Sequence, residues 1–401
     1  MNYRANSVPE VTFYPMEADG ANYPKATIPL LPPASWSGWL GRKHVAAGSA
    51  FVQGKVSFIR GRYALAEAMR RAGAGPGKAV LLPAFHCRAM VEPALYIGAQ
   101  PCFYPVMADL RPDFSAFPSL LSERGVPVAA MVITHYFGFP NDVDEAERFC
   151  AAHGIALIED CAHALYGRTG ERLLGTVGSY ATASVWKFLP VRDGALLLDN
   201  TGGQPLSRTA QPLLAELKAL TAMLQGWGQR VWRRHSLAVI DASTLREQAK
   251  LVAAQSKSRA VVPGLKEFSP RLVALAALRS SRWLMAHAAH NHIAQRRRTN
   301  YLKWLEGMRS VSGVKPLFPD LPEGVVPYAF PLLIDASGMG FHLLKMAGIP
   351  LLRWEDMAVT DCAISRDYRI RVLQLPCHQG LHADELDWMV RTVQALLSEL
   401  D

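Results

Sequence analysis

The stretch "VPVAAMVITHYFGFPNDVDEAERFCAAHGIALIEDCAHALYG", residues 126–167, decides the fold class of this chain. It contains two apolar runs, 126–138 and 155–160, separated by residues 142–154, which have apolar side chains at helical spacing and end on a glycine. A strand, a helix and a second strand in this order predict a parallel pair, because parallel strands need a crossover connection. Ligands of parallel sheets bind at the carboxyl ends of the strands, so Asp160 is expected at a binding edge.

The same alternation of strand and helix surrounds this stretch. Apolar residues recur at helical spacing in 61–73 and 86–99, and short apolar runs lie at 78–85 and 100–106. Strands separated by helices of this length indicate a mainly parallel sheet covered on both faces, which is an α/β fold. From Val314 onward the pattern is that of a smaller α+β domain.

The predicted domain organisation has three parts. These are an N-terminal arm at 1–57, a large α/β domain at 58–265, and an interdomain helix with a small C-terminal α+β domain at 266–401. Residues of about 203–264 form a basic helical insert in the large domain, and the pattern at 270–308 predicts one long helical stretch.

The composition indicates a large core and excludes several classes of protein. Half of the 401 residues are hydrophobic, and no run of 18 apolar residues is long enough to span a membrane. The six cysteines form no CxxC pair, and the N-terminus lacks the apolar segment of a signal peptide, so we expect reduced thiols and a cytoplasmic location. The net charge of +9 favours anionic ligands, but no nucleic-acid-binding motif accompanies it, so no nucleic acid is expected as partner.

Lys187 provides the second half of a candidate site. It follows the apolar segment "SYATASVW", where burial would lower the pKa of the amine and make it a nucleophile toward aldehydes. An acid at one strand end and a lysine after a later strand are what pyridoxal phosphate (PLP) requires. The acid keeps the pyridine nitrogen protonated, and the lysine binds the aldehyde. Judged by their spacing alone, Asp160 and Lys187 are more often a salt bridge, or an acid and a surface lysine, than a catalytic pair.

Longer motifs decide between a structural and a catalytic role for these two residues. They are "GRYALAEAMRRAGAGPGKAVLLPAF" (61–85), "YIGAQPCFYPV" (96–106), the stretch from Ile133 to Gly167, and "GTVGSYATASVWKFLPVRDGALLL" (175–198). In this order they resemble the DegT/DnrJ/EryC1/StrS family, fold-type I PLP enzymes that mostly aminate nucleotide-linked keto-sugars. The segments "RRRTNYLKWLEGM", "MAGIPLL" and "LQLPCHQGLHADEL" resemble the family's C-terminal domain.

The resemblance implies a role for each matching residue. Lys187 falls on the lysine that binds the cofactor and then transfers protons, and Asp160 on the acid that pairs with the pyridine nitrogen. His163 would hydrogen-bond the phenolic oxygen of the cofactor or position its ring. Gly61 and Arg62 begin a helix whose N-terminus would bind the cofactor phosphate.

For each of the remaining cofactor contacts, more than one residue of this chain is a candidate. Thr182 occupies the place of the family's phosphate-binding serine, and Ser184 is a near rival. His86 or Phe85 would cover the ring face, although the family often has an aromatic residue one position later, where this chain has Cys87.

Two departures from the family concern the substrate pocket and the dimer. The family's Gly-Glu-Gly-Gly is here "VRDGA", in which Arg192 is a candidate substrate contact, as is Trp354 in "LLRWEDM". The asparagine that a neighbouring subunit usually supplies to the phosphate has no match, and "LKEFSP" (265–270) stands near its place.

Several charged clusters are expected to be structural. The histidines of "HAAHNH" (287–292) and "LPCHQGLH" (375–382) lack the spacing of a complete metal site, so no metal is expected. The three arginines at 296–298 most simply cover a solvated helix face.

The insert carries an apolar stripe of uncertain purpose: Leu213, Leu217, Leu220, Leu224 and Trp227, with Lys218, Arg230, Arg233 and Arg234 nearby. Such a helix packs within its chain or across a dimer, or else it lies on an anionic membrane surface or a partner. The stretch 270–308 offers further apolar residues, namely Leu272, Leu275, Leu278, Trp283 and Leu284. We expect a homodimer in which a two-fold partner covers one of the two stripes.

The predicted function is that of a PLP-dependent aminotransferase. It would move an amino group from an amino acid, such as glutamate, to a keto group on a nucleotide-linked sugar, for polysaccharide or glycosylated-metabolite biosynthesis. One alternative is amination of a non-sugar carbonyl compound, and another is a regulatory relative without turnover. The family's sugar dehydratases have histidine in place of the lysine, so Lys187 argues against them.

Overall fold

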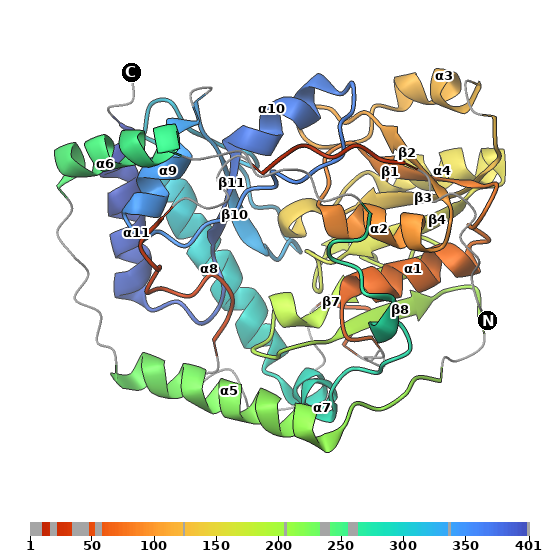
Figure 1. Ribbon diagram of the computed structural model, residues 1–401, viewed down its shortest axis with the longest axis horizontal. Helices are drawn as coiled ribbons and strands as arrows, with labels where there is room; N and C mark the ends of the chain where they lie inside the picture. The colour runs from red at the N-terminus through yellow and green to blue at the C-terminus, as the bar shows by residue number, and fades with distance from the viewer. Residues whose placement is uncertain are drawn as a thin grey trace.

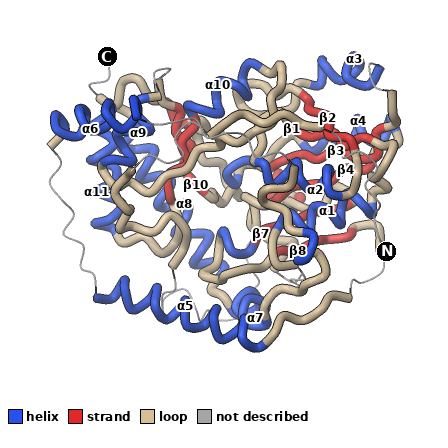
Figure 2. Tube along the Cα trace, viewed as in Figure 1, coloured by secondary structure: helices blue, strands red, loops and turns tan. Residues whose placement is uncertain are grey.

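The computed structural model of this chain contains two main β-sheets. The larger has six strands in the order β2 (Gln100–Tyr104), β1 (Ala79–Pro83), β3 (Val128–Thr134), β4 (Ala156–Cys161), β7 (Tyr180–Ser184) and β8 (Ala195–Asp199). The smaller has three, in the order β11 (Val372–Pro376), β10 (Ala329–Leu333) and β9 (Lys315–Pro316). Figures 1 and 2 show the two sheets in opposite halves of the molecule. The structure describes residues 10–16, 22–33, 48–52, 58–122, 125–203, 207–232, 241–255, 264–335 and 338–398.

The larger sheet confirms the predicted α/β fold. Strands β1, β2, β3, β4 and β7 pair in parallel, and only β8 runs antiparallel, at the edge beside β7. The register places Thr134 of β3 opposite Asp160 of β4, and Asp160 opposite Thr182 of β7. Three polar side chains therefore meet at the carboxyl edge of the sheet.

Helices cover both faces of this sheet. Side chains alternate between the faces of a strand, so Val80 and Leu82 of β1 pack with helices α1 (Gly61–Arg71) and α2 (Arg88–Tyr96). Ala79 and Leu81 point the other way, into the core that contains α4 (Val143–His153) and α3 (Phe117–Ser122). This burial on both faces explains why the strands read as continuous apolar runs.

The crossover helix α4 has a clear start and stop in the sequence. The Asp142 side chain accepts a hydrogen bond from the Glu145 N–H at the N-terminus of the helix. Gly154 ends the helix with φ of 64°, a left-handed conformation that favours glycine. The chain then enters β4, which carries Asp160 to the sheet edge.

The C-terminal part has the predicted α+β character. Strand β10 pairs antiparallel with both β9 and β11. The helices of this part are α8 (His290–Met308), α9 (Met339–Met346), α10 (Ala363–Arg371) and α11 (Ala383–Leu397).

The predicted continuous helical stretch at 270–308 is wrong. A single turn at Pro270–Leu272 is followed by α7 (Arg279–His287) and then by α8, with Ala288 in an extended conformation between the two helices. His290 stabilises the break, because its Nε2 bonds the Met285 carbonyl and its Nδ1 bonds the Tyr166 hydroxyl. The spacing of apolar residues alone does not predict that the chain changes direction between α7 and α8.

The described part of the insert contains the helices α5 (Leu213–Trp232) and α6 (Ala242–Gln255), in agreement with its predicted helical character. Figure 1 shows α5 beside α7 and α6 beside α9, so the insert reaches from the large sheet to the C-terminal part. Ala242 and Leu245 of α6 pack against the C-terminal core. Among the described residues, no helix is both long and apolar enough to cross a bilayer. The side chains of Trp227 and Arg230, and the residues Arg233 and Arg234, lie outside the described part.

Candidate cofactor site

A cavity lies where the carboxyl ends of β4 and β7 face the N-terminus of α1, the position at which parallel sheets bind ligands. Its lining contains five of the residues singled out from the sequence: Gly61, Arg62, Asp160, Ser184 and Lys187. It also contains residues to which the sequence assigned no role, chiefly Arg60 and Trp186, and Cys87 in place of an aromatic residue. Side chains separated by more than 100 positions in the chain thus share one cavity.

Lys187 ends a short turn, Val185–Lys187, directly after β7. Burial lowers the pKa of its amine, and the Arg62 guanidinium lowers it further, whereas Cys87 and Asp160 raise it. The ammonium lies 5.5 Å from the centre of the Tyr328 ring and 6.0 Å from that of Trp186. A lowered pKa leaves more of the amine neutral, which is the form that attacks an aldehyde.

Asp160 is buried at the end of β4, where only 6% of its surface is exposed. One carboxylate oxygen accepts a hydrogen bond from the Ala162 N–H at 2.9 Å. Burial raises the pKa of Asp160, and the bonds from Ala162 and Thr182 together with the Lys187 charge act against this rise. Thr182 therefore contacts the carboxylate of Asp160, although it does not line the cavity.

The other end of the cavity is built for an anion. A Cβ placed on Gly61 would lie 2.5 Å from the Ser184 hydroxyl oxygen, so glycine lets the first turn of α1 approach this hydroxyl without displacing it. Helix N-termini favour anions, because their first N–H groups have no partner within the helix. Arg60 lies against Trp186, with its guanidinium 4.7 Å from the ring centre, and its Nη1 is buried without a hydrogen-bond partner among the described residues.

The two ends together fit PLP. The N-terminus of α1 and Arg60 would bind its phosphate. Asp160 would pair with its pyridine nitrogen, and Lys187 would bind its aldehyde. The buried Nη1 of Arg60, which has no hydrogen-bond partner among the described residues, most directly indicates an anion-binding site. Arg60 is a cation directly before a helix start, but the sequence analysis predicted Gly61 and Arg62 at the phosphate.

The positions of Phe85 and His86 do not support a role over the cofactor ring. His86 is fully buried, its Nδ1 bonds the Pro83 carbonyl at 2.9 Å, its Nε2 accepts from the Ala358 N–H at 3.0 Å, and its ring stacks on Phe103. Phe85 packs against Trp354 and other aromatic rings. Neither side chain lines the cavity, whereas Cys87 does.

His163 and Trp354 belong to an aromatic cluster beside the cavity. The His163 ring lies 4.4 Å from Tyr328 and 5.5 Å from Trp354, measured between ring centres, and its Nδ1 accepts from the Phe137 N–H. Burial lowers the pKa of His163 well below its usual range, and the Lys187 charge lowers it further. His163 is therefore a neutral ring near the lysine, and neither it nor Trp354 lines the cavity.

Arg192 does not line the cavity either. Its side chain is exposed and donates a hydrogen bond to the Lys218 carbonyl of α5 at 3.3 Å. Asp193, the next residue, accepts bonds from Gln211, the Leu278 N–H and the Ser281 hydroxyl. The departure from the family in "VRDGA" thus attaches the insert and α7 to the large sheet.

The expectation that residues 296–298 cover a solvated face is wrong for Arg297. This side chain is 0% exposed, and it donates to the Lys187 carbonyl at 3.1 Å and to the Tyr328 carbonyl at 3.0 Å. Its guanidinium also lies over the Phe188 ring. Arg297 therefore holds the turn that presents Lys187, and nothing in the sequence near Lys187 indicates it.

A buried group of possible ligands, His135, Glu159 and Cys161, lies on the other side of β4. Glu159 accepts bonds from the N–H groups of Gly175, Val177 and Gly178, and it also bonds His135 Nε2 at 3.0 Å. The Asn141 N–H occupies the second ring nitrogen of His135. These bonds use the lone pairs that a metal ion would need, so the group anchors loops around β4.

The fold and this arrangement of lysine, aspartate and helix N-terminus define the class of fold-type I PLP enzymes. Residues 50–194 match the model of the DegT/DnrJ/EryC1/StrS aminotransferase family. The chain is similar to UDP-N-acetyl-3-dehydro-alpha-D-glucosamine 3-aminotransferase of Acidithiobacillus ferrooxidans, with 31% identity over 37% of this chain and 38% of that protein. It is also similar to L-glutamine:2-deoxy-scyllo-inosose aminotransferase of Micromonospora echinospora, with 30% identity over 40% of this chain and 38% of that protein. The chain thus spans less than half the length of each of these two relatives.

Solved structures resemble the fold over a longer range. The aminotransferase TlmJ from Streptoalloteichus hindustanus superposes with a TM-score of 0.63 at 22% identity, covering 93% of this chain and 100% of that one. DesV of S. venezuelae gives a TM-score of 0.58 at 20% identity, covering 86% of this chain and 85% of that one. At these identities the likeness concerns the fold.

Proposed function

We propose that this chain is a PLP-dependent aminotransferase that transfers an amino group from an amino acid, glutamate in the simplest case, to a keto group on a nucleotide-linked sugar. The observation that carries the proposal is the meeting of Lys187, Asp160 and the N-terminus of α1 around one cavity. The match of residues 50–194 to an aminotransferase family supports it.

The residues have distinct roles in this reaction. When bound, PLP supplies an electron sink for the carbon atom next to the amino group. Lys187 Nζ binds the cofactor and, once released, carries a proton between cofactor and substrate carbon as a general acid–base. Asp160 holds the proton on the pyridine nitrogen, and Arg297 fixes the backbone of the Lys187 turn.

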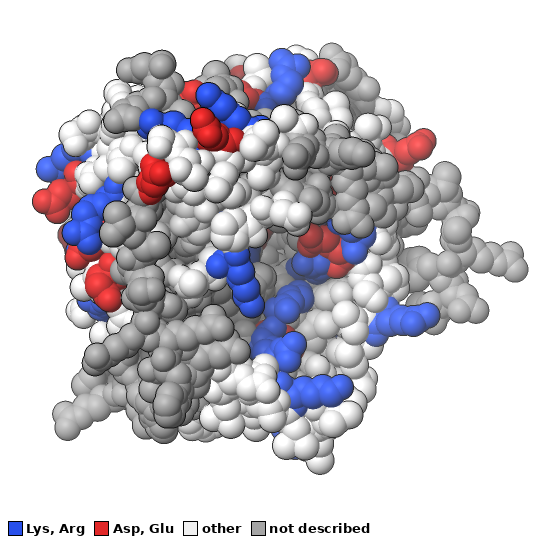
Figure 3. All heavy atoms as spheres, turned by 60° about the vertical axis from the view of Figure 1, so that its left-hand side comes forward, with Lys and Arg blue, Asp and Glu red and all other residues white. Residues whose placement is uncertain are grey.

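An anionic sugar substrate fits the charge of the chain. The formal net charge is +9, and Figure 3 shows Lys and Arg side chains gathered around a hollow on one face. The relative from Acidithiobacillus ferrooxidans carries a UDP-linked sugar in its name. These observations favour a nucleotide-linked keto-sugar for polysaccharide or glycosylated-metabolite biosynthesis.

Amination of a different carbonyl compound is the second candidate. The relative from Micromonospora echinospora acts on 2-deoxy-scyllo-inosose by its name, which carries no nucleotide, and its donor is L-glutamine. The altered segment at 191–195 also supports this alternative, since it replaces the family's glycine-rich turn. Glutamine therefore belongs beside glutamate among the donors to test.

A two-stage experiment tests the proposed function. Purified protein with PLP should show the visible absorption band of a lysine-bound cofactor, and glutamate or glutamine should bleach this band. The bleached protein should then aminate a nucleotide-linked keto-sugar, read by the mass of the product. A band that no amino donor changes would instead support the alternative of a regulatory relative without turnover.

We also propose that the chain forms a homodimer and acts in the cytoplasm. Helix α5 leaves its leucines uncovered: Leu213, Leu214, Leu217, Leu220 and Leu224 are 44–70% exposed. A two-fold partner would bury such a stripe through a self-complementary interface. All six cysteines are free thiols, and thiols remain reduced in the cytoplasm.

A further inference from the structure

Two arginines lie at the anion end of the cavity, and they differ in their partners. Arg62 forms an ion pair with Glu267, with 2.8 Å between Nη2 and Oε2, and it also donates to the Glu267 carbonyl. Arg60 forms no ion pair among the described residues, and its buried Nη1 has no hydrogen-bond partner there. Within the part of the chain that the structure describes, the positive charge of Arg62 is thus balanced by an acid, and that of Arg60 is not.

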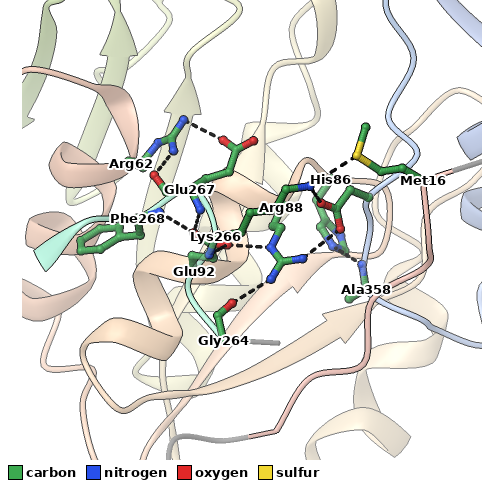
Figure 4. A network of polar contacts seen from close by, with 11 residues as sticks. Met16, Arg62, His86, Arg88, Glu92, Gly264, Lys266, Glu267, Phe268 and Ala358 are labelled. Atoms are coloured by element: carbon green, nitrogen blue, oxygen red, sulfur yellow. Dashed lines mark hydrogen bonds and ion pairs between the residues drawn. The ribbon is translucent and has the colours of Figure 1, made fainter. Parts of the chain in front are cut away.

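The ion pair of Arg62 is held in place by buried groups, as Figure 4 shows. Glu92 of α2 is fully buried and accepts the backbone N–H groups of Lys266, Glu267 and Phe268 at 2.6–2.8 Å. Arg88 bonds Glu92 at 2.6 Å and the Gly264 carbonyl at 2.7 Å. Segment 264–268 therefore holds the Glu267 carboxylate beside Arg62.

Among the described residues, Arg60 has no comparable acid as an ion-pair partner. Asp193 is the acid that acts most on its charge, but the Asp193 oxygens already accept bonds from Gln211, Leu278 and Ser281. Trp186 covers one face of the guanidinium, and both residues line the cavity. A buried donor without a partner is rare in proteins, and at a binding site it marks the place of a ligand acceptor.

We infer that Arg60, and not Arg62, is the cation that binds the cofactor phosphate, together with the first turn of α1 and the Ser184 hydroxyl. Glu267 neutralises Arg62 and so limits the charge at the phosphate to a single guanidinium. This inference rests on the proposed function insofar as the anion is the phosphate of PLP. It assigns the phosphate counter-ion to a residue of the same chain.

The test compares PLP with pyridoxal, which lacks the phosphate. Dissociation constants for both would be measured by absorbance with the wild-type protein and with Arg60→Gln, Arg60→Lys and Arg62→Gln. Arg60→Gln should weaken PLP binding about 10- to 100-fold, since it removes a charge-assisted hydrogen bond, and should leave pyridoxal binding unchanged. Arg60→Lys should recover part of the loss.

Arg62 and Glu267 provide the matched controls. Arg62→Gln should weaken PLP binding by less than about threefold, because its charge is already paired at a partly exposed site. Glu267→Gln should free Arg62 and tighten PLP binding by up to about tenfold. A larger loss in Arg62→Gln than in Arg60→Gln would overturn the inference, as would an equal loss of PLP and pyridoxal in Arg60→Gln.

Titration with inorganic phosphate separates this inference from the proposed function. Phosphate should bind the apo-protein by calorimetry and should lose affinity in Arg60→Gln. If the wild-type protein binds phosphate through Arg60 but shows no band with PLP, the proposed function fails and the anion site stands. If PLP binds normally and Arg60→Gln changes neither ligand, the anion site fails and the proposed function stands.

Discussion

The surroundings of Lys187 set the chemistry of its amine, whereas its backbone position does not depend on its own side chain. Arg297 holds the Lys187 carbonyl, which any side chain at this position retains. Lys187→Ala should therefore give a folded protein that has lost the visible PLP band and all transamination. Absorbance and a glutamate half-reaction measure both effects, and the exposed lysine Lys218→Ala is the matched control. A variant that keeps the band and turns over would refute the assignment.

The variant Asp160→Asn removes the negative charge of the carboxylate but keeps the shape of the side chain. The amide can still accept the Ala162 hydrogen bond, so we expect the cofactor to remain bound. Without a carboxylate to hold the pyridine nitrogen protonated, single-turnover transamination should fall about 100-fold or more. Near-normal rates would mean that another acid pairs with the ring nitrogen.

The sequence indicates Lys187 and Asp160 because each is a charged residue at the end of an apolar strand. It does not indicate Arg297 or Glu267, whose partners in the site are 110 and 205 positions away. Their roles depend on tertiary contacts that no local pattern encodes. Arg60 is an intermediate case, since its position before α1 is visible in the sequence, but its buried, unpartnered nitrogen is not.

At the scale of elements, His86 joins the end of β1 and the start of α2 to the C-terminal segment at Ala358. Burial lowers the pKa of His86 from 6.5 to about 4. Between these pH values the unfolded chain binds a proton that the folded chain does not, so stability falls as pH falls. This histidine alone should reduce the free energy of unfolding by about 3 kcal/mol between pH 6.5 and 4.

Urea unfolding at several pH values checks this expectation. His86→Gln should be less stable at pH 7 because it loses buried hydrogen bonds, yet its stability should change less between pH 6.5 and 4. The exposed histidine His153→Gln is the control and should keep the wild-type pH dependence. Parallel pH profiles for wild type and His86→Gln would show that the His86 pKa is not depressed.

Helices are predicted correctly where the apolar periodicity agrees with the residues that start and end a helix. Helix α4 has an aspartate at its start and a glycine at its end, and both its bounds and the flanking strands follow the sequence. The stretch 270–308 has apolar periodicity without such signals, and the extended Ala288 that divides it is fixed by contacts of His290 with Tyr166 and Met285. Tertiary hydrogen bonds there override local propensity.

At the scale of the whole molecule, the exposed stripe of α5 is the feature that a single chain leaves unexplained. Residues 213, 217, 220 and 224 fall on one line of the helix, whereas the buried residues Ala219 and Met223 face α5's own chain. The stripe therefore points away from the protein. A large obligate interface is mostly apolar and buries upwards of about 2,000 Å², so these leucines would supply part of one.

We predict a homodimer that persists at micromolar concentration and carries one PLP per chain. Replacing Leu217, Leu220 and Leu224 together by Glu should convert it to a monomer in sedimentation velocity, because burying three carboxylates across a two-fold axis costs far more than the leucines contribute. The single variant Leu302→Glu, on an exposed face of α8, is the control and should leave the dimer intact.

The same triple variant distinguishes the dimer from a membrane role for the insert. If α5 lies on anionic lipid, the variant should stay dimeric with its cofactor and should lose binding to phosphatidylserine vesicles in a flotation assay, since three added acids repel that surface. If α5 forms the dimer interface, the variant should become monomeric, and the wild-type dimer should not float with vesicles, because its leucines are already buried. A cofactor-loaded wild-type monomer at micromolar concentration would refute the dimer outright.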